Sequence, residues 1–223
     1  MEPTRRPRLK ICCIQSVAEA RLAVRYGASA LGLVSAMPSG PGVITEEAIA
    51  AIAAEVPPPV ARFLLTSLED VPAIVDQQRR LGTDTLQLCD RLRRGTHRQL
   101  RQALPGVRLV QVVHVGGEES LDEARAVAPE VDALLLDSGN QSLAVKELGG
   151  TGRRHDWALS RRIREAVGVP VFLAGGLRAE NVREAIEAVG PFGLDLCTGV
   201  RVDGALDESR LAAFAASLAA AGP

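Results

Sequence analysis

Short runs of apolar residues alternate along the chain with longer stretches in which apolar residues recur at helical spacing. Such runs predict buried strands, and apolar positions three to four residues apart predict helices that cover them. We count eight strand and helix pairs. The predicted strands span Leu9–Cys13, Ala30–Val34, Ala61–Leu65, Thr85–Cys89, Arg108–His114, Ala133–Asp137, Val171–Ala174 and Leu194–Cys197. The predicted helices start near Ser16, Thr45, Leu68, Thr96, Ser120, Trp157, Ala179 and Asp207.

This order of elements predicts an α/β fold, a single (β/α)8 TIM barrel domain over residues 1–223. An open doubly wound sheet is built from the same units. However, the first strand is followed by Cys13-Ile14-Gln15-Ser16, which is not a Gly-rich dinucleotide loop. Two long connections, Ser35 to Ile44 and Ser138 to His155, both follow strands. Because the loops after the strands of a barrel carry its chemistry, we expect the functional site there.

Composition narrows the class of ligand. Aromatic residues make up only 3% of the 223 residues, so the core must be aliphatic, and stacking on nucleobases is not expected. Lys and Arg number 26 against 27 Asp and Glu, and a net charge of −1 favours neither nucleic acid nor an anionic membrane. We therefore expect a small-molecule ligand, no nucleic acid and no membrane.

The cysteines and the N-terminus predict the compartment. Four cysteines, of which Cys12 and Cys13 are adjacent, do not resemble a disulfide framework and are expected to be reduced thiols. The basic N-terminus is not followed by an apolar run of signal-peptide length, and no later run approaches the length of a membrane span. We expect a cytoplasmic protein.

Polar and reactive residues close the predicted strands, and in a barrel these ends converge on one mouth. They are Cys12, Cys89, His114, Asp137 and Cys197. Strand alternation places Lys10 and Cys12 on one face and Cys13 on the other. If Cys12 faces the barrel interior, Cys13 is expected to pack against the helices.

Cys12 and Asp137 each have a functional and a structural interpretation. A thiol beside a cation is partly ionised near neutral pH and can remove a proton, whereas a Cys in an apolar strand is more often a small buried hydrophobe. Asp137 follows four apolar residues, where a carboxylate is costly unless it has partners or a function. A cap or a salt bridge in the next loop would explain it equally well.

Glycines at two predicted strand ends favour phosphate binding. Gly175 and Gly176 follow the seventh strand, and Thr198 and Gly199 follow the eighth. Barrels commonly bind phosphate there through backbone N–H groups that glycine leaves accessible. A single His at a strand end, such as His114, is more often a hydrogen-bonded structural residue than a catalytic one.

Metal and anion sites are less well supported. Cys12, Cys89 and Cys197 lack the close spacing of a zinc site, so no metal is expected. Arg153, Arg154 and His155 form a basic cluster that is either a solvated face or an anion contact.

Taken together and in order, these motifs resemble the phosphoribosylanthranilate isomerase family over nearly the whole chain. The matching segments are Lys10-Ile11-Cys12, Leu135-Leu136-Asp137, Gly149-Gly150-Thr151-Gly152 with Asp156-Trp157, Leu173-Ala174-Gly175-Gly176-Leu177 with Glu180-Asn181-Val182, and Thr198-Gly199-Val200. The resemblance implies that Cys12 is a general base and Asp137 a general acid. It also implies that the glycine-rich segments bind the substrate or its phosphate, through Gly150, Gly152, Gly175, Gly176, Thr198 and Gly199. Lys10, Gln87, His114 and Arg154 are possible substrate contacts.

The reaction implied by this resemblance is an Amadori rearrangement of an N-linked ribose phosphate. Asp137 protonates the ring oxygen, the ring opens to an iminium, and Cys12 takes the proton from C2. The implied partner is a phosphosugar substrate, with no cofactor or metal, and the chain is expected to be a monomer or a homodimer.

The chain also departs from the family pattern. Cys13 replaces a glycine, Cys89-Asp90 stands where His-Gly is usual, and Arg201 replaces an acidic residue. The Pro38-Ser39-Gly40-Pro41-Gly42-Val43 loop lacks the arginine that binds the anthranilate carboxylate in the family. Either another cation, such as Arg91, Arg153 or Arg154, replaces it, or the enzyme acts on a different phosphoribosyl amine or phosphosugar. A non-catalytic barrel that binds a phosphorylated ligand is the third interpretation.

Overall fold

We describe the protein from a computed structural model, which covers residues 6–139, 143–150 and 152–221. Within these ranges, eight parallel strands form a closed barrel in chain order, and the first strand pairs with the last. The strands are β1 (Arg8–Ile11), β2 (Ala30–Val34), β3 (Ala61–Thr66), β4 (Thr85–Leu88), β5 (Arg108–His114), β6 (Ala133–Asp137), β7 (Val171–Leu173) and β8 (Gly193–Leu196). The predicted (β/α)8 fold is confirmed, and the open sheet is wrong because β1 and β8 close the ring.

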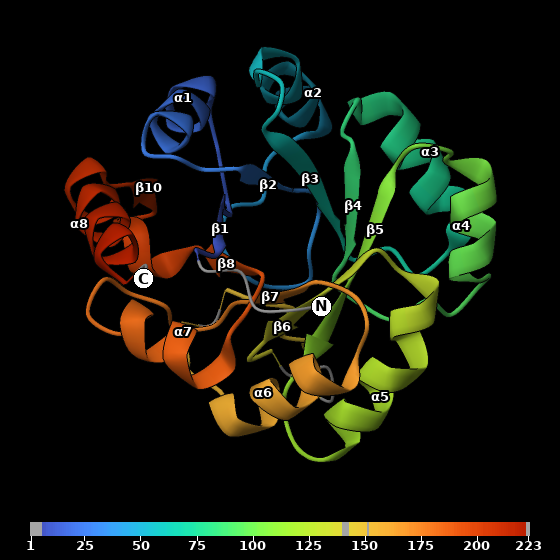
Figure 1. Cartoon of the computed structure of the whole chain (residues 1–223). Helices are drawn as coiled ribbons and strands as arrows, with labels where there is room; N and C mark the ends of the chain where they lie inside the picture. The colour runs from blue at the N-terminus through green and yellow to red at the C-terminus, as the bar shows by residue number, and fades with distance from the viewer. Residues whose placement is uncertain (1–5, 140–142, 151, 222–223) are drawn as a thin grey trace.

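The helices surround the barrel, as Figure 1 shows. In the described part of the chain they are α1 (Val17–Arg25), α2 (Glu46–Glu55), α3 (Val71–Leu81), α4 (His97–Ala103), α5 (Glu119–Val127), α6 (Trp157–Ala166), α7 (Val182–Val189) and α8 (Glu208–Ala220). Two 3-10 helices, η1 (Ala128–Glu130) and η2 (Thr198–Val200), and a hairpin of β9 (Arg201–Val202) and β10 (Ala205–Leu206) complete the connections. No helix of the described residues is both long and apolar enough to cross a membrane.

Side-chain caps begin several helices where the sequence predicts them. Ser16, Thr45, Thr96 and Asp207 each accept a backbone N–H three residues later, which satisfies a donor that the helix leaves free. By contrast, α3 and α7 each begin three residues later than expected. Before α7, Arg178 donates its N–H to the side chain of Asn181, and this turn delays the helix.

Several strands end earlier than predicted. β1 stops at Ile11, and β4, β7 and β8 stop one residue before Cys89, Ala174 and Cys197. At Cys13 the backbone φ is 62°, a left-handed conformation that a strand cannot contain. These residues therefore belong to the loops at the barrel mouth.

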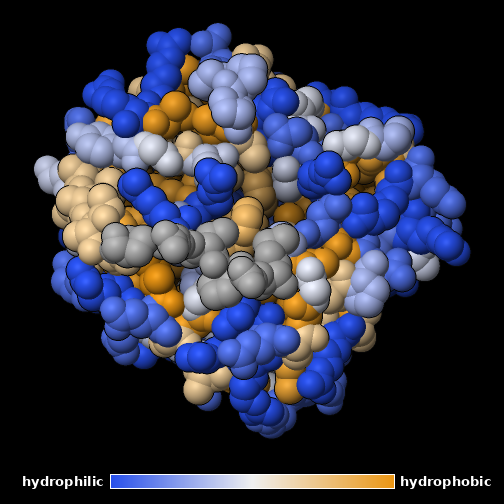
Figure 2. Space-filling view, viewed as in Figure 1, coloured by the Kyte–Doolittle hydropathy of each residue, from blue (hydrophilic) through white to orange (hydrophobic). Residues whose placement is uncertain are grey.

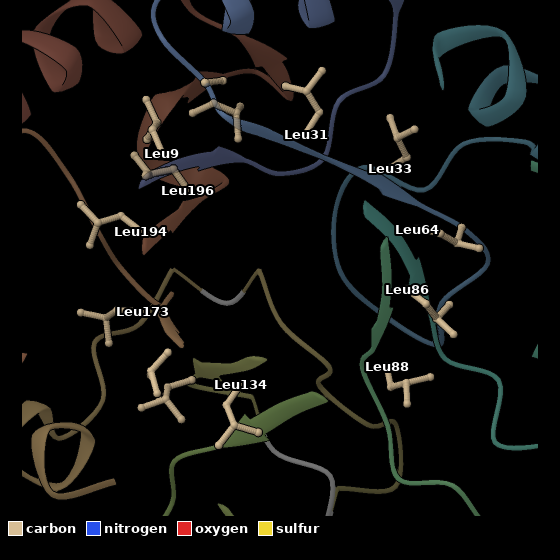
Figure 3. Close-up of a cluster of buried hydrophobic side chains, with 14 of the residues drawn as sticks. Leu9, Leu31, Leu33, Leu64, Leu86, Leu88, Leu134, Leu173, Leu194 and Leu196 are labelled. Atoms are coloured by element: carbon tan, nitrogen blue, oxygen red, sulfur yellow. The ribbon is translucent and has the colours of Figure 1, made fainter. Parts of the chain in front are cut away.

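Two apolar layers make up the core. The outer layer lies between strands and helices, and Figure 3 shows leucines from most of the strands pointing into it, among them Leu31, Leu64 and Leu134. A fully buried leucine contributes about 1.5–3 kcal/mol to stability. The inner layer fills the barrel and includes Phe63 and Phe172, whose rings meet edge to face. Figure 2 shows hydrophilic side chains over the ring of helices, with hydrophobic residues between them.

Candidate active site

A pocket opens at the carboxyl ends of the strands. Cys12, which follows β1, and Asp137, which ends β6, both line it. The other predicted site residues that line it are Gln87, Gly150, Gly152, Gly175, Gly176, Thr198 and Gly199. Ser39, Gly40 and Pro41 of the loop without an arginine form part of its wall. The pocket therefore gathers most of the predicted site.

Cys12 follows the end of β1, and its N–H donates to the carbonyl of Leu196 at 2.7 Å. Its thiol lies above Gly32, where a Cβ would come within 2.9 Å of the sulfur. The Cys13 thiol lowers the pKa of Cys12, burial opposes this, and the ammonium of Lys10 lowers it further, so that the pKa lies below its ordinary value. A thiolate is the form of Cys that can accept a proton.

Beneath Cys12, Lys10 and Asp195 form an ion pair inside the barrel. Their charged atoms are 2.8 Å apart, and the Lys10 side chain is fully buried. Burial alone would lower the pKa of Lys10, but Asp195 and then Cys12 raise it above its ordinary value, so the side chain stays an ammonium. Sequence reasoning missed Asp195, although an Asp within the apolar run Gly193–Leu196 is the same signal that marked Asp137.

Asp137 is the last residue of β6, and its carboxyl group is buried. Burial raises the pKa of Asp137 above its ordinary value, even though the N–H of Ser138 donates to the carboxyl oxygen at 2.7 Å. Gly149 has a φ of 136°, and a Cβ there would lie 2.7 Å from the other carboxyl oxygen. The raised pKa favours a protonated acid that can donate.

Glycines and Thr198 from the connections after β6, β7 and β8 form one wall of the pocket. Gly175 and Gly176 follow β7 with φ of 81° and 66°, a left-handed conformation that costs glycine little. A Cβ on Gly152 would lie 3.2 Å from the hydroxyl oxygen of Thr198, which begins η2. This wall exposes backbone that an anion can approach closely. Thr151 of the Gly149–Gly152 motif lies outside the described residues.

The expectation for Cys13 is wrong. Cys13 belongs to the inner layer and lines the pocket instead of packing against the helices. Strand alternation stops at Ile11, and the left-handed φ of Cys13 turns its side chain back toward the mouth. Contacts with the thiols of Cys12 and Cys197, together with burial, raise the pKa of Cys13 well above its ordinary value.

The remaining polar residues lie outside the pocket wall. Lys10 is below the floor, and an imidazole nitrogen of His114 is 3.1 Å from the carbonyl oxygen of Cys89. Arg154 lies over the ring of Trp157, 3.5 Å from its centroid, and pairs with Glu184 at 2.7 Å. Neither His114 nor Arg154 lines the pocket of the described residues, and their role as substrate contacts stays a prediction.

None of the cations considered as replacements for the missing arginine lines the described pocket. Arg91 pairs with Glu123 through two hydrogen bonds of 2.8 and 2.7 Å, and Arg153 pairs with Glu147. Cys12, Cys89 and Cys197 all line the pocket, but the described residues contain no group of three or more His, Cys, Asp or Glu arranged to hold a metal.

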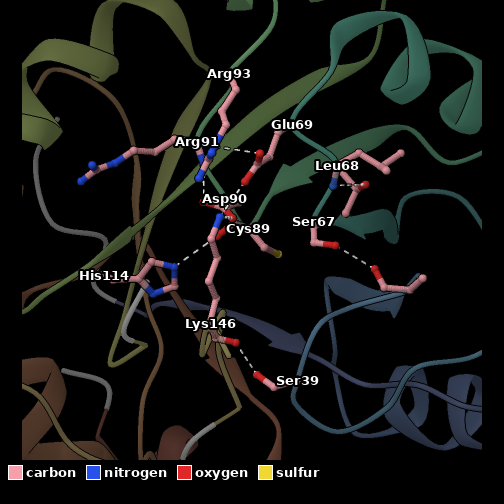
Figure 4. A network of polar contacts seen from close by, with 12 residues as sticks. Ser39, Ser67, Leu68, Glu69, Cys89, Asp90, Arg91, Arg93, His114 and Lys146 are labelled. Carbon is pink, nitrogen blue, oxygen red and sulfur yellow. Dashed lines mark hydrogen bonds and ion pairs between the residues drawn. The ribbon is translucent and has the colours of Figure 1, made fainter. Parts of the chain in front are cut away.

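Lys146 was not singled out from the sequence. Figure 4 shows its side chain reaching from the β6–α6 loop to Glu69 and Asp90. Its ammonium lies 2.6 Å from Glu69 and also pairs with Asp90, and its carbonyl accepts a hydrogen bond of 2.6 Å from Ser39. Three loops therefore meet at this lysine. An isolated Lys in a long polar loop gives no local signal of such contacts.

Comparisons with known proteins agree on one family. The family model described as N-(5'phosphoribosyl)anthranilate (PRA) isomerase matches residues 9–217. The N-(5'-phosphoribosyl)anthranilate isomerase of Methanocella arvoryzae is 34% identical over 204 residues, 92% of this chain and 93% of the relative.

Solved structures agree with the sequence relatives. The phosphoribosyl anthranilate isomerase of Thermotoga maritima has a TM-score of 0.80 at 28% identity, covering 96% of this chain and 99% of the other. A phosphoribosyl anthranilate isomerase in complex with reduced 1-(o-carboxyphenylamino)-1-deoxyribulose 5-phosphate has a TM-score of 0.78 at 26% identity, with coverage of 96% and 99%.

Proposed function

The chain belongs to the N-(5'-phosphoribosyl)anthranilate isomerase family, and on this basis we propose that it rearranges N-(5'-phosphoribosyl)anthranilate to the aminoketose, with Asp137 as general acid and Cys12 as general base. The observation that carries the assignment is the position of these two groups in one pocket with oppositely shifted pKa values. The reaction is an intramolecular oxidoreduction, because C1 is reduced while C2 is oxidised. It belongs to tryptophan biosynthesis.

Asp137 acts first. Its carboxyl group donates a proton to the furanose ring oxygen, the bond between C1 and that oxygen breaks, and the amine nitrogen supplies the electron pair that forms the iminium. A buried carboxyl group with a raised pKa keeps its proton closer to neutral pH than an exposed one. The resulting aspartate has the N–H of Ser138 as a hydrogen-bond donor.

Cys12 acts second. Its thiolate takes the proton from C2, and the electrons of that C–H bond neutralise the iminium to give an enolamine. The enolamine then gains a proton at C1 and loses the hydroxyl proton at O2, which yields the aminoketose. The buried ammonium of Lys10 supports the thiolate before the transfer.

The glycine wall is the proposed phosphate site. Gly150, Gly152, Gly175, Gly176, Thr198 and Gly199 all line the pocket. They lie at or near the ends of β7 and β8, where barrels commonly bind phosphate through backbone N–H groups. Gln87, on β4, lines the pocket with its amide oxygen buried and unpaired, so we propose that it contacts the substrate.

One observation favours a second candidate substrate. The loop from Pro38 to Val43 supplies no arginine to the pocket. The same proton transfers on another phosphoribosyl amine are therefore the alternative. A non-catalytic barrel explains less, because binding alone requires neither a carboxyl group with a raised pKa nor a thiol with a lowered pKa.

We also propose a monomer or homodimer in the cytoplasm. The compartment follows from the need to keep the thiol of Cys12 reduced.

The test is the loss of substrate fluorescence when the purified protein is mixed with freshly generated phosphoribosylanthranilate. We expect turnover by the wild type and a loss of at least 100-fold in kcat for both Cys12→Ser and Asp137→Asn. Cys89→Ala, which removes another pocket thiol, distinguishes the loss of the proposed base from a general effect of removing a thiol from the pocket. Full turnover by Cys12→Ser would refute the proposed base, and no turnover by the wild type would direct the search to other phosphoribosyl amines.

A further inference from the structure

The described pocket wall contains no lysine or arginine, although it does contain the carboxyl groups of Asp137 and Asp195. The compound bound by the solved relative has a phosphate at C5 and a carboxyl group on the phenylamino substituent at C1. Glycine backbone provides N–H groups for the phosphate, but no described residue of the wall carries a positive charge for the carboxylate, and burying a carboxylate without a cation is costly. The pocket therefore lacks a partner for one end of such a substrate.

Lys146 is positioned at the edge of that pocket. Its carbonyl accepts from Ser39, which lines the wall, and Leu148, two residues later, lines it as well. Its ammonium pairs with Asp90, the residue that follows the pocket residue Cys89. As Figure 4 shows, the side chain extends from the loop beside Ser39 to Glu69 and Asp90.

The Lys146 ammonium also lies on the side of the barrel mouth that faces the glycine wall. Glu69 follows β3 and Asp90 follows β4, whereas the glycine wall follows β7 and β8. In the closed ring, β3 and β4 lie half-way round from β7 and β8. A substrate whose phosphate occupies the glycine wall directs its far end toward Lys146.

The charges around Lys146 allow an exchange of partners. Glu69 has a second cation, Arg93, whose guanidinium nitrogen lies 2.8 Å from its carboxylate. Asp90 is buried, with 6% of its side chain exposed, while Glu69 is 28% exposed. Glu69 can therefore turn to Arg93 and leave Lys146 with Asp90 and an incoming carboxylate. In this arrangement every acid keeps a cation.

We propose that Lys146 is the specificity residue that binds the aryl carboxylate of the substrate, in place of an arginine in the loop from Pro38 to Val43. This inference rests on the proposed isomerase function. It assigns Glu69 as the carboxylate that occupies the ammonium before the substrate arrives.

The test compares two substrates that differ only in the carboxyl group, N-(5-phosphoribosyl)anthranilate and N-(5-phosphoribosyl)aniline, with product formation followed by chromatography. Lys146→Met is expected to raise KM for the anthranilate compound about tenfold, since a hydrogen bond to a charged group contributes roughly that factor. The same change should alter KM for the aniline compound by less than about twofold. An equal rise in KM for both substrates overturns the proposal. That result is expected if Lys146 is only a latch, that is, if its ion pairs with Glu69 and Asp90 only hold the β6–α6 loop in place.

Three further variants sharpen the comparison. Lys146→Arg keeps the charge and should preserve most of the preference for the anthranilate compound. Glu69→Gln removes the competing carboxylate and should lower KM for that compound, whereas a latch would be weakened and KM would rise. Arg91→Met, which removes a cation paired outside the pocket, is the matched control and should leave the preference unchanged.

Failure of this inference differs from failure of the proposed function. If the wild type converts neither substrate, the isomerase proposal fails. If it converts both equally well and Lys146→Met changes neither, the isomerase proposal stands and the assignment of Lys146 is wrong.

Discussion

At the scale of single residues, the pocket separates an acid from a base by their surroundings. Burial raises the pKa of Asp137, which has no directly paired cation among the described residues. Cys12 is equally enclosed, but the neighbouring Cys13 thiol and the Lys10 ammonium lower its pKa. A group acts as an acid only when it is protonated and as a base only when it is not. These pKa shifts therefore suit Asp137 to act as the acid and Cys12 to act as the base.

The raised pKa of Asp137 predicts how Asp137→Asn changes stability with pH. The folded state holds this proton more tightly than the unfolded state, so the favourable contribution is present below the ordinary carboxyl pKa and is lost as pH rises through the folded pKa. Asp137→Asn should therefore increase the free energy of unfolding at pH 7 to 8, with a gain that disappears toward pH 3. Urea unfolding across this range measures it.

Asp132→Asn is the matched control, because the pKa of Asp132 is shifted in the opposite direction. Burial opposes ionisation of Asp132, but the N–H of Leu109 and then Arg101 lower its pKa below the ordinary value. Its contribution is present above the unfolded pKa and is lost as pH falls through the folded one. Asp132→Asn should destabilise at neutral pH. A gain for both variants, or a gain for Asp137→Asn that is independent of pH, would contradict the assignment.

At the scale of elements, the turn after β1 is tied to the connection after β8. Arg201 donates to the carbonyl of Cys13 and, at 2.8 Å, to Glu19 of α1. Glu19 in turn accepts the N–H of Leu206 at 2.9 Å and that of Gln15 at 3.0 Å. The left-handed turn at Cys13, which costs a non-glycine residue about 1–2 kcal/mol, is held by this group of contacts.

We predict that Arg201→Gln destabilises the protein by about 2–3 kcal/mol, because it leaves the Glu19 carboxylate enclosed without its cation. The double variant Glu19→Gln/Arg201→Gln should recover part of this loss, since no unpaired charge remains. Thermal unfolding measures both. Arg80→Gln, which breaks the exposed pair with Glu46, should cost less than about 1 kcal/mol. Equal costs at the two sites would show that burial of the Arg201 pair adds nothing.

At the scale of the whole molecule, closure of the barrel depends on pairing between the first and last strands. Lys10 and Asp195 are register partners on β1 and β8, and their side chains meet in the interior. Their separation of 185 positions in sequence makes this the longest-range ion pair in the described part of the chain. The same pair lies directly under Cys12, so closure and the electrostatics of the pocket share two residues.

Lys10→Met should destabilise the fold by about 3–5 kcal/mol, because it leaves Asp195 as an uncompensated charge in the barrel. Lys10→Met/Asp195→Leu should regain most of that stability but turn over more slowly than the wild type, since the thiolate of Cys12 has lost one of the groups that lower its pKa. Urea unfolding and the fluorescence assay measure the two effects. A double variant as unstable as the single one would show that packing, not charge, makes Lys10 important.

The sequence alone determined the elements and the end of the barrel that carries the chemistry. Apolar runs and helical spacing are local properties, and capping residues such as Ser16 and Thr96 mark helix starts within three residues. Strand ends are local as well, which is why Cys12, Asp137 and the glycines after β7 and β8 could be predicted to share one mouth.

Only the tertiary structure decided how side chains pair at that mouth. The direction of Cys13 depends on a left-handed turn, the pairing of Asp195 on closure between β1 and β8, and the position of Lys146 on acids 77 and 56 residues away. No periodicity encodes such contacts. Their energies depend on burial and on which charges the closed barrel brings within hydrogen-bond distance, and both exist only once the chain has folded.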